Sequence, residues 1–130
     1  MKLLVAVIFS AVLAGCKKSE DTTILDGVYA GTFYRSHPWS DTATVILNFS
    51  GNHFTGQSNK NYYPAICSGT YTVTGNKIHF ENSCPWTANF DWSFILSNDF
   101  SFTVNGKKLE MVRSYDGIIF YSDNYQLTKQ

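Results

Sequence analysis

The chain has 130 residues, of which 16% are aromatic and 15% are charged, and its ten Lys and Arg residues balance ten Asp and Glu residues. An aromatic share this large beside so few charges excludes a disordered polypeptide, because enough apolar surface is present to build a core. The balanced charge leaves no basic excess for a nucleic-acid surface.

Residues 1–15 are the first predicted element, a secretory signal. A positive charge at Lys2 precedes an apolar run over residues 3–9, and small residues follow up to Gly15. This pattern is typical of a signal peptide that is removed on export. The apolar run is too short for a helix that spans a bilayer.

The end of this element, Leu13-Ala14-Gly15-Cys16, resembles the bacterial lipobox, in which a peptidase cuts before the cysteine and its thiol is acylated, for example with palmitate. The resemblance implies loss of residues 1–15 and a lipid bilayer as partner through Cys16. Each buried lipid methylene contributes about 0.8 kcal/mol, so several acyl chains would hold the protein at a membrane almost permanently. Two alternatives stay open: an ordinary cleaved signal that leaves Cys16 free, and an uncleaved anchor helix, which the charges of Lys17 and Lys18 disfavour.

Residues 16–24 are predicted to hold the lipidated cysteine and a flexible tether, because they are polar and lack periodicity. Residues 25–130 are predicted to form the folded domain. Removing 15 of the 130 residues leaves 115, a length that suits one domain with a single core.

The folded part consists of short β-prone runs separated by turn dipeptides such as Gly51-Asn52 and Asn105-Gly106. We therefore predict an all-β fold, a single antiparallel up-and-down meander that closes into a small barrel of eight to nine strands. The expected strands cover residues 26–35, 42–50, 53–59, 68–74, 77–83, 91–97, 100–105, 107–115 and 118–127.

Two-residue turns fix the register that we expect for two of the hairpins. The opposed pairs are Phe49 with Phe54 across Gly51-Asn52, and Phe102 with Leu109 across Asn105-Gly106. A three-residue loop at 97–99 aligns Leu96 with Phe100. Pairing across Asp116-Gly117 mixes the two faces, so we expect a longer loop or a β-bulge there.

Cys67 and Cys84 are the only possible internal pair once the lipobox cysteine is assigned to lipid. An exported protein meets an oxidising compartment, so a disulfide is expected between them. A two-residue turn at Gly75-Asn76 supports this pairing, because the register that places Tyr71 opposite Phe80 also places Cys67 opposite Cys84. Closing a loop of about 17 residues would stabilise the fold by roughly 3 kcal/mol.

One end of the predicted barrel carries the candidate site. Successive connections of a meander alternate between the two ends, and the first, third and fifth, residues 36–41, 60–67 and 84–90, are long and aromatic. We interpret this end as a mouth for a ligand or a partner. The candidate residues are Trp39, Tyr62, Tyr63 and Trp86. In the alternative interpretation, the aromatic residues fold inward and plug a barrel too small to hold a ligand.

No catalytic or metal-binding pattern stands out in the sequence. His37, His53 and His79 are far apart, and none has a neighbour at metal-ligand spacing. The glycines are explained by turns and the first strand, not by a phosphate loop. We therefore expect no enzymatic activity, no metal and no cofactor.

Three segments carry a family resemblance: residues 25–33 (LDGVYAGTF), 69–76 (GTYTVTGN) and 125–127 (YQL). They are similar to the small lipocalin-like lipoproteins of Gram-negative bacteria, with Tyr29 where lipocalins carry the Trp of their Gly-x-Trp motif. The resemblance implies a lipid-anchored barrel at the outer membrane, on its periplasmic face or at the cell surface.

These features together predict a non-enzymatic binding domain that presents its aromatic loop end to a small apolar molecule or a glycan. The alternative is an envelope protein-interaction module, an inhibitor or assembly accessory, with a filled barrel. A hydrolase is the third interpretation. A filled interior would exclude the small-molecule version, and a flat aromatic patch would favour a protein partner. The residues expected to fill the interior are Tyr29, Phe33, Phe49, Phe80, Phe94 and Phe102.

Overall fold

The structure is a computed structural model that describes Gly15, residues 25–37 and residues 41–130. Cys16, Trp39 and the predicted signal apart from Gly15 lie outside the described residues. Within these ranges, no helix has the length and apolar character needed to cross a membrane. The described elements are β1 (Gly27–Arg35), β2 (Thr42–Ser50), β3 (His53–Ser58), β4 (Ser68–Thr74), β5 (Lys77–Asn82), the 3-10 helix η2 (Trp92–Phe94), β6 (Asn98–Asn105), β7 (Lys108–Tyr115) and β8 (Tyr121–Lys129).

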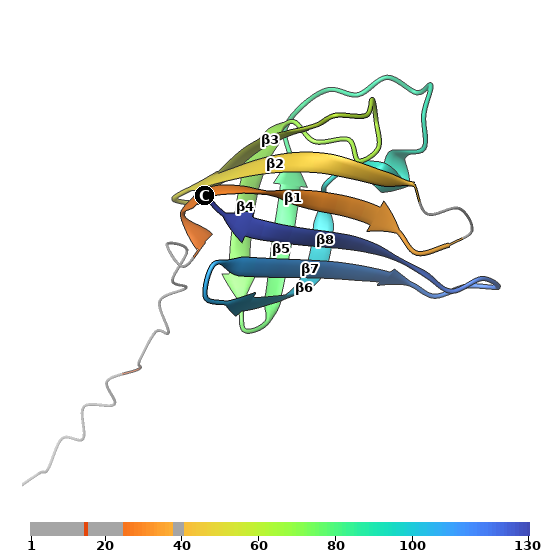
Figure 1. Ribbon diagram of the computed structural model, residues 1–130. Coiled ribbons are helices and arrows are strands. Elements are labelled where there is room, and N and C mark those ends of the chain that lie inside the picture. The colour runs from red at the N-terminus through yellow and green to blue at the C-terminus, as the bar shows by residue number, and fades with distance from the viewer. Residues whose placement is uncertain (1–14, 16–24, 38–40) are drawn as a thin grey trace, which may run out of the picture.

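The strands form one closed antiparallel barrel (Figure 1). Each strand pairs with its neighbours along the chain, and β8 pairs with β1. The predicted all-β class and up-and-down meander are confirmed. The barrel has eight strands because the strand predicted over residues 91–97 does not form.

Side chains alternate between the interior and the exterior of the barrel, as a period of two requires. In β2 every second residue from Ala43 to Phe49 is buried and the residues between them are exposed. Aromatic rings fill much of the interior and contact one another edge to face, for example Phe49 and Tyr71, whose centroids lie 5.0 Å apart. The largest fully buried aromatic side chains are Tyr71, Tyr125, Phe33, Phe49, Phe54, Phe80 and Phe100.

Four of the six aromatic residues expected inside the barrel are buried, and two are not fully so. Phe94 and Phe102 are partly buried and pack against the edge of the core. Phe100, two positions before Phe102, takes the deeper place in β6. The buried four are Tyr29, Phe33, Phe49 and Phe80.

The β2–β3 and β4–β5 hairpins have the predicted registers. The opposed pairs include Phe49 with Phe54 and Tyr71 with Phe80. Gly51 and Gly75 open the two turns with φ values of 61° and 60°, which glycine adopts without a steric penalty. A glycine with positive φ at the first turn position is typical of the type II′ turns that close hairpins.

The predicted register of the β6–β7 hairpin is wrong by two residues. The turn is Gly106-Lys107, so Phe102 lies opposite Met111 instead of Leu109. An Asn-Gly dipeptide favours a type I′ turn with glycine second, whereas Gly106 comes first here, with a φ of 60°. A shift of two residues leaves each side chain on its original face, so the predicted faces remain correct.

The strand predicted over residues 91–97 is wrong, as is the three-residue turn after it. The segment begins with η2, and β5 pairs directly with β6, with Ile78 opposite Phe100. The side chain of Asp91 accepts a hydrogen bond from the backbone N–H of Ser93 at 2.9 Å. This cap favours a helical turn at a point where apolar alternation alone predicts a strand.

The two ends of the barrel differ in the length of their connections. Three two-residue turns, 51–52, 75–76 and 106–107, lie at the tight-turn end, where the chain also enters β1 (Figure 1). The long connections lie together at the other end, the loop-rich end, as predicted. This end also includes the longer loop expected after β7. Its connections are residues 36–41, 59–67, 83–97 and 116–120.

Cys67 and Cys84 form the predicted disulfide, with their Cα atoms 6.3 Å apart and a sequence separation of 17. They lie just beyond the ends of β4 and β5 and join two connections of the loop-rich end. The same connections pair in parallel, because the Ala65 N–H donates to the Phe94 carbonyl and the Leu96 N–H donates to the Ala65 carbonyl, both at 3.0 Å. This pairing covers the loop-rich end where β4 and β5 stop.

Candidate functional site

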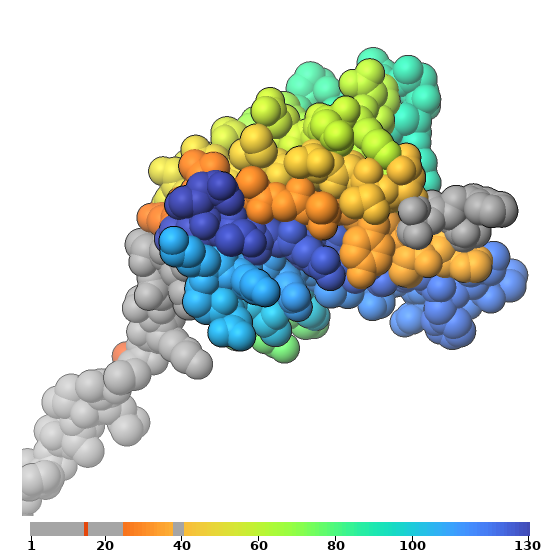
Figure 2. Space-filling model, viewed as in Figure 1, coloured from red at the N-terminus to blue at the C-terminus, as the bar shows by residue number. Residues whose placement is uncertain are grey.

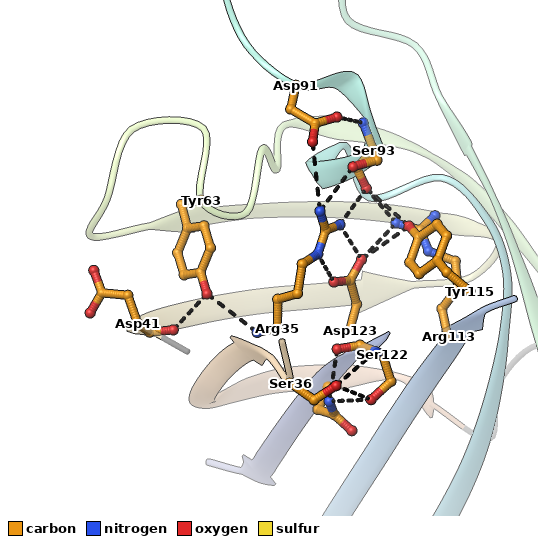
Figure 3. A network of polar contacts seen from close by, with 11 residues as sticks. Arg35, Ser36, Asp41, Tyr63, Asp91, Ser93, Arg113, Tyr115, Ser122 and Asp123 are labelled. Carbon is orange, nitrogen blue, oxygen red and sulfur yellow. Dashed lines mark hydrogen bonds and ion pairs between the residues drawn. The ribbon is translucent and has the colours of Figure 1, made fainter. Parts of the chain in front are cut away.

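A buried ion pair lies at the loop-rich end, between the last residue of β1 and a facing residue of β8. Arg35 and Asp123 are opposed in the β1–β8 register and are 7% and 1% exposed. Arg35 donates from Nε to Oδ1 at 2.6 Å and from Nη2 to Oδ2 at 2.9 Å (Figure 3). This two-pronged geometry is the strong form of an arginine–carboxylate contact.

Strand β7 adds two more donors to the same carboxylate. Nη2 of Arg113 and the hydroxyl of Tyr115 each lie 3.1 Å from Oδ2 of Asp123. Two guanidinium groups therefore share one buried carboxylate. The exposed carboxylate of Asp91, 3.7 Å from Nη1 of Arg35, offsets part of the excess positive charge. Arg35, Arg113, Tyr115 and Asp123 are called the mouth network below.

Burial and charge shift the pKa values of two groups in the mouth network. Burial alone would lower the pKa of Arg35, but the hydrogen bond and the charge of Asp123 outweigh it, so the pKa is raised. Burial raises the pKa of Tyr115 well above its ordinary value, and the charge of Asp123 raises it further. At neutral pH, Arg35 is therefore charged and Tyr115 is a neutral donor.

The mouth network also binds η2 and closes the barrel. The Ser93 carbonyl accepts a hydrogen bond from Nη2 of Arg113 at 2.7 Å. It also lies 3.1 Å from the hydroxyl of Tyr115, whose single proton is shared between this carbonyl and Asp123. A third bond, from Nη2 of Arg35, is longer at 3.3 Å. The guanidinium carbon of Arg35 lies 3.7 Å from the ring centroid of Phe94, a cation–π contact. Connection 83–97 is thus held across the mouth by side chains of β1 and β7.

Tyr63, one of the predicted mouth residues, turns inward. Its ring centroid lies 5.2 Å from that of Phe33 and 4.9 Å from that of Phe94. Its hydroxyl donates to the Asp41 carbonyl at 2.6 Å and accepts from the backbone N–H of Arg35 at 3.3 Å. Tyr63 therefore helps to plug the mouth.

Tyr62 and Trp86, two further predicted residues, meet on the outside of the loop-rich end. The ring of Tyr62 stacks on Phe90, with centroids 4.1 Å apart and planes 8° from parallel, and Trp86 packs edgewise against both. Nε1 of Trp86 donates to Oδ1 of Asn82 at 3.0 Å, which fixes the indole to the end of β5. The three rings form the outer aromatic cluster, and Tyr62 is 39% exposed within it. Trp39 lies outside the described residues.

A shallow depression of about 190 Å³ borders the outer aromatic cluster. Tyr62 and Trp86 contribute apolar walls, and Gln57 and Asn61 contribute amide groups. Amides beside exposed aromatic rings can form hydrogen bonds to a polar ligand while the rings cover its apolar faces.

The histidines lie on the outer surface. His37 and His53 are exposed, whereas Nδ1 of His79 lies 2.7 Å from Oδ1 of Asp99 on the exterior of the barrel. That contact links β5 to β6. In the part of the chain that the structure describes, no group of three or more His, Cys, Asp or Glu side chains is placed to hold a metal ion.

Comparisons with known proteins found no family model, curated protein or solved structure that matches the chain. The closed eight-stranded barrel is compatible with the lipocalin-like resemblance of the three sequence segments. A functional role for the site is therefore inferred from the geometry of its residues.

Sequence reasoning missed the mouth network. Arg35, Arg113 and Asp123 each lie two positions from a buried core residue of the same strand, so all three occupy interior positions. A charged residue at an interior strand position needs a buried partner, because an isolated buried charge is strongly unfavourable. This parity is the signal in the sequence that could have revealed the network.

Sequence reasoning also missed an apolar projection between β7 and β8. The predicted strand over 118–127 begins too early, because Tyr115 pairs with Tyr121 and leaves a five-residue connection, 116–120. Ile118, Ile119 and Phe120 are exposed to 104%, 55% and 74%, and are called the apolar finger below. Pairing across Asp116-Gly117 mixes buried and exposed side chains on one face, and this mismatch indicates that neither strand includes residues 118–120.

Proposed function

We propose that this protein is a lipoprotein, anchored through Cys16 to the outer membrane of a Gram-negative bacterium, and that its barrel is a non-enzymatic module that binds another envelope protein. The observation that carries the proposal is the filled and closed interior. A barrel without room inside has to bind its partner from its outer surface. The anchor is supported by the lipobox resemblance of residues 13–16.

Aromatic side chains occupy the space where a small ligand would lie. The rings of Phe33, Phe49 and Phe80 are each 1% exposed, and the mouth network closes the end above them. Four surface depressions have volumes of about 190 to 280 Å³, and none of these four is lined by the aromatic core residues. A ligand inside would displace buried rings, each worth roughly 1.5–3 kcal/mol of burial. This favours a surface contact over a carrier of small apolar molecules.

The outer aromatic cluster is the surface that we propose for the protein partner. Tyr and Trp are enriched among the residues that contribute most to protein interfaces. Here their rings are fixed before binding, by stacking on Phe90 and by the bond from Trp86 to Asn82. The disulfide holds the two connections that carry the cluster. A fixed surface loses little conformational entropy when a partner binds.

A photo-crosslinking residue in place of Tyr62 tests this proposal in the native envelope. We expect p-benzoylphenylalanine at this position to give one discrete adduct with a protein on irradiation. The matched control is the same residue in place of Thr103, which is exposed on β6 near the tight-turn end, and no adduct is expected there. Absence of an adduct at position 62, or the same products at both positions, would contradict the proposal.

The anchor has a test of its own. We expect labelled palmitate to be incorporated into the wild-type protein and not into Cys16→Ser. Mass spectrometry of the purified wild-type chain should place the acyl groups on an N-terminal Cys16. A chain that carries no acyl group, or that begins at another residue, would refute the lipoprotein assignment.

A glycan is the second candidate, and the depression beside Tyr62 and Trp86 favours it. Tryptophan fluorescence of the protein would be titrated with glycans from its own envelope. Saturable quenching that is lost in Trp86→Ala would support glycan binding, and quenching that persists in that variant would exclude this depression as the site.

A further inference from the structure

The apolar finger projects beyond the barrel at the loop-rich end, as the blue segment between β7 and β8 shows (Figures 1 and 2). Its three side chains follow one another directly around the turn, and all three are exposed. The turn therefore displays apolar surface on more than one side. Exposed apolar groups that cluster in this way mark contacts with a protein or a membrane.

The base of the finger is held in place by the mouth network. Tyr115 and Tyr121 pair across the two strands with their rings stacked, at a centroid distance of 4.5 Å. The hydroxyl of Tyr115 donates to Asp123, and the guanidinium carbon of Arg35 lies 4.8 Å from the ring centroid of Tyr121. The finger therefore leaves the barrel in a defined direction.

We propose that the apolar finger inserts into the surface layer of a lipid bilayer. It gives the barrel a second membrane contact besides the acyl anchor, and in that respect the inference rests on the proposed function. The finger is a different site from the outer aromatic cluster, whose residues belong to the connections 59–67 and 83–97. Figure 1 shows these connections away from the turn between β7 and β8.

Exposure on several sides favours lipid over a protein groove. A groove in a protein contacts part of an inserted turn, and the rim of such an interface is normally polar. Ile118, Ile119 and Phe120 leave no polar side chain among the three. Acyl chains surround an inserted group completely, and the hydrophobic effect that stabilises it there has no preferred direction.

The residues around the finger also suit a membrane surface. Tyr115 and Tyr121 stand at its base, and tyrosine is enriched at the boundary between lipid and water. Residues 115–121 contain one formal charge, Asp116, and no Lys or Arg. The finger itself therefore carries no positive charge, and Arg35, which borders Ile119, is already paired with Asp123, so we expect apolar contact to dominate its binding.

The length of the tether allows both contacts to reach one membrane. Leu25, where the described domain begins, is fully buried, and the adjacent Asp26 accepts a hydrogen bond from the N–H of Gly51 at the tight-turn end. The turn that carries the finger lies at the opposite end (Figure 1). A segment of nine residues, the length of 16–24, can span at most roughly 30 Å, about the length of a nine-residue strand. A barrel lying on its side can therefore place its anchor and its finger on the same surface. The anchor would keep the finger at a high local concentration, so a weak contact would suffice.

Vesicle flotation tests the finger without the acyl anchor. The chain from residue 16 onward, with Cys16→Ser, contains every described strand and is mixed with phosphatidylcholine vesicles. We expect it to float with the vesicles, and Ile118→Ser/Phe120→Ser to lower its partition coefficient about tenfold. The control, Ile46→Ser/Val104→Ser, removes two exposed apolar side chains from the barrel wall and should change the coefficient by less than about twofold.

Two further readouts separate the possible outcomes. The tryptophan emission of the Phe120→Trp variant should shift to the blue when vesicles are added, in high salt as well as in low salt. The emission of Val104→Trp should not shift. Failure of the Cys16→Ser chain to float, or equal flotation of the finger and control variants, would overturn the inference. A blue shift caused only by an added envelope protein would assign the finger to a protein contact and overturn it too. Palmitate incorporation and crosslinking at Tyr62 report on the proposed function separately.

Discussion

The tight-turn end and the loop-rich end of this barrel are built by different kinds of contact. At the tight-turn end, three two-residue turns each begin with a glycine at a φ near 60°, and each turn joins adjacent strands. At the loop-rich end, the main contacts join distant positions, such as Arg35 and Asp123, which are 88 residues apart. Each turn at the first end forms within its own hairpin and adds one backbone hydrogen bond to the next strand, from the N–H of Tyr71, Phe102 or Lys129. The second end depends on a few side chains that several elements share.

This difference has a consequence for stability and for function. A fault in one tight turn should affect its own hairpin and, through one backbone hydrogen bond, the next strand, because the neighbouring turns share no residue with it. A fault at Asp123 affects β1, β7 and η2 together, because all three contact this carboxylate or the residues bonded to it. The outer aromatic cluster and the apolar finger both stand on this second, more cooperative end.

Removing the shared carboxylate gives the largest expected effect. Asp123→Ala leaves Arg35 and Arg113 buried without their partner, and breaking a buried ion pair in this way typically costs about 3–5 kcal/mol. We expect a loss of this size in the free energy of unfolding, measured by urea denaturation. Glu110→Ala is the control, because it removes an exposed carboxylate from β7, and it should change stability by less than about 0.5 kcal/mol. Equal effects would mean that the mouth network does not hold this end together.

Removing the disulfide comes next in size. The double variant Cys67→Ser/Cys84→Ser releases a crosslink over 17 positions, so we expect a loss of roughly 3 kcal/mol. Limited proteolysis should then cut within connection 83–97 first and leave the turn at Gly75 intact. In the wild-type protein, thiol titration after denaturation without reductant should find neither cysteine free. Two reactive thiols would disprove the crosslink and the register that predicts it.

The same contrast explains how far sequence alone could go. The tight-turn end was predictable because alternation and glycine turns are local signals, and even the two-residue error at Gly106 kept every side chain on its face. The disulfide was predictable because the register brings Cys67 opposite Cys84. The conformation of residues 91–97 was not predictable, because their apolar alternation equals that of a strand. Their pairing partner, Ala65, is also distant in sequence.

The candidate site also has a part that the sequence predicts and a part that it does not. Topology correctly brought the aromatic connections to one end, so Tyr62 and Trp86 could be grouped in advance. It could not show that Tyr63 turns inward, because loop residues have no fixed alternation and its direction depends on Phe33 and Phe94. The apolar finger was not predicted, because a β-prone triplet next to a turn is interpreted as the start of a strand.

Alkaline unfolding compares one tyrosine from each end. Burial raises the pKa of Tyr71, near the tight-turn end, to about 12, and burial also raises the pKa of Tyr115 in the mouth network. The unfolded chain ionises near pH 10, before either folded tyrosine does. Their contribution to stability is therefore complete below pH 10 and is lost as the pH rises toward 12, by about 1.4 kcal/mol per pH unit for each group.

Urea denaturation at a series of pH values checks this expectation. Tyr71→Phe and Tyr115→Phe should each reduce the fall in stability above pH 10, because each removes one of the four tyrosines whose pKa is raised by burial, Tyr29, Tyr71, Tyr115 and Tyr125. Tyr34→Phe, at a half-buried position of β1 outside the mouth network and the buried core, is the control. If stability falls equally steeply in all three variants, ionisation elsewhere in the chain must cause the alkaline unfolding.

The smallest expected effect comes from a matched pair of glycines, one at each end. A Cβ at Gly106 would meet no atom within 4 Å, so Gly106→Ala acts only through its φ of 60°, at a cost of about 1–2 kcal/mol. Gly117 has no positive φ, and a Cβ there would make only an ordinary contact with the Ile119 carbonyl oxygen at 3.9 Å, so Gly117→Ala should be neutral or stabilise by up to about 1 kcal/mol. Thermal unfolding measures both, and the crosslink at Tyr62 should survive in both. A larger loss at Gly117 than at Gly106 would mean that the loop-rich end also depends on local backbone conformation, and the division between local and long-range ends would fail.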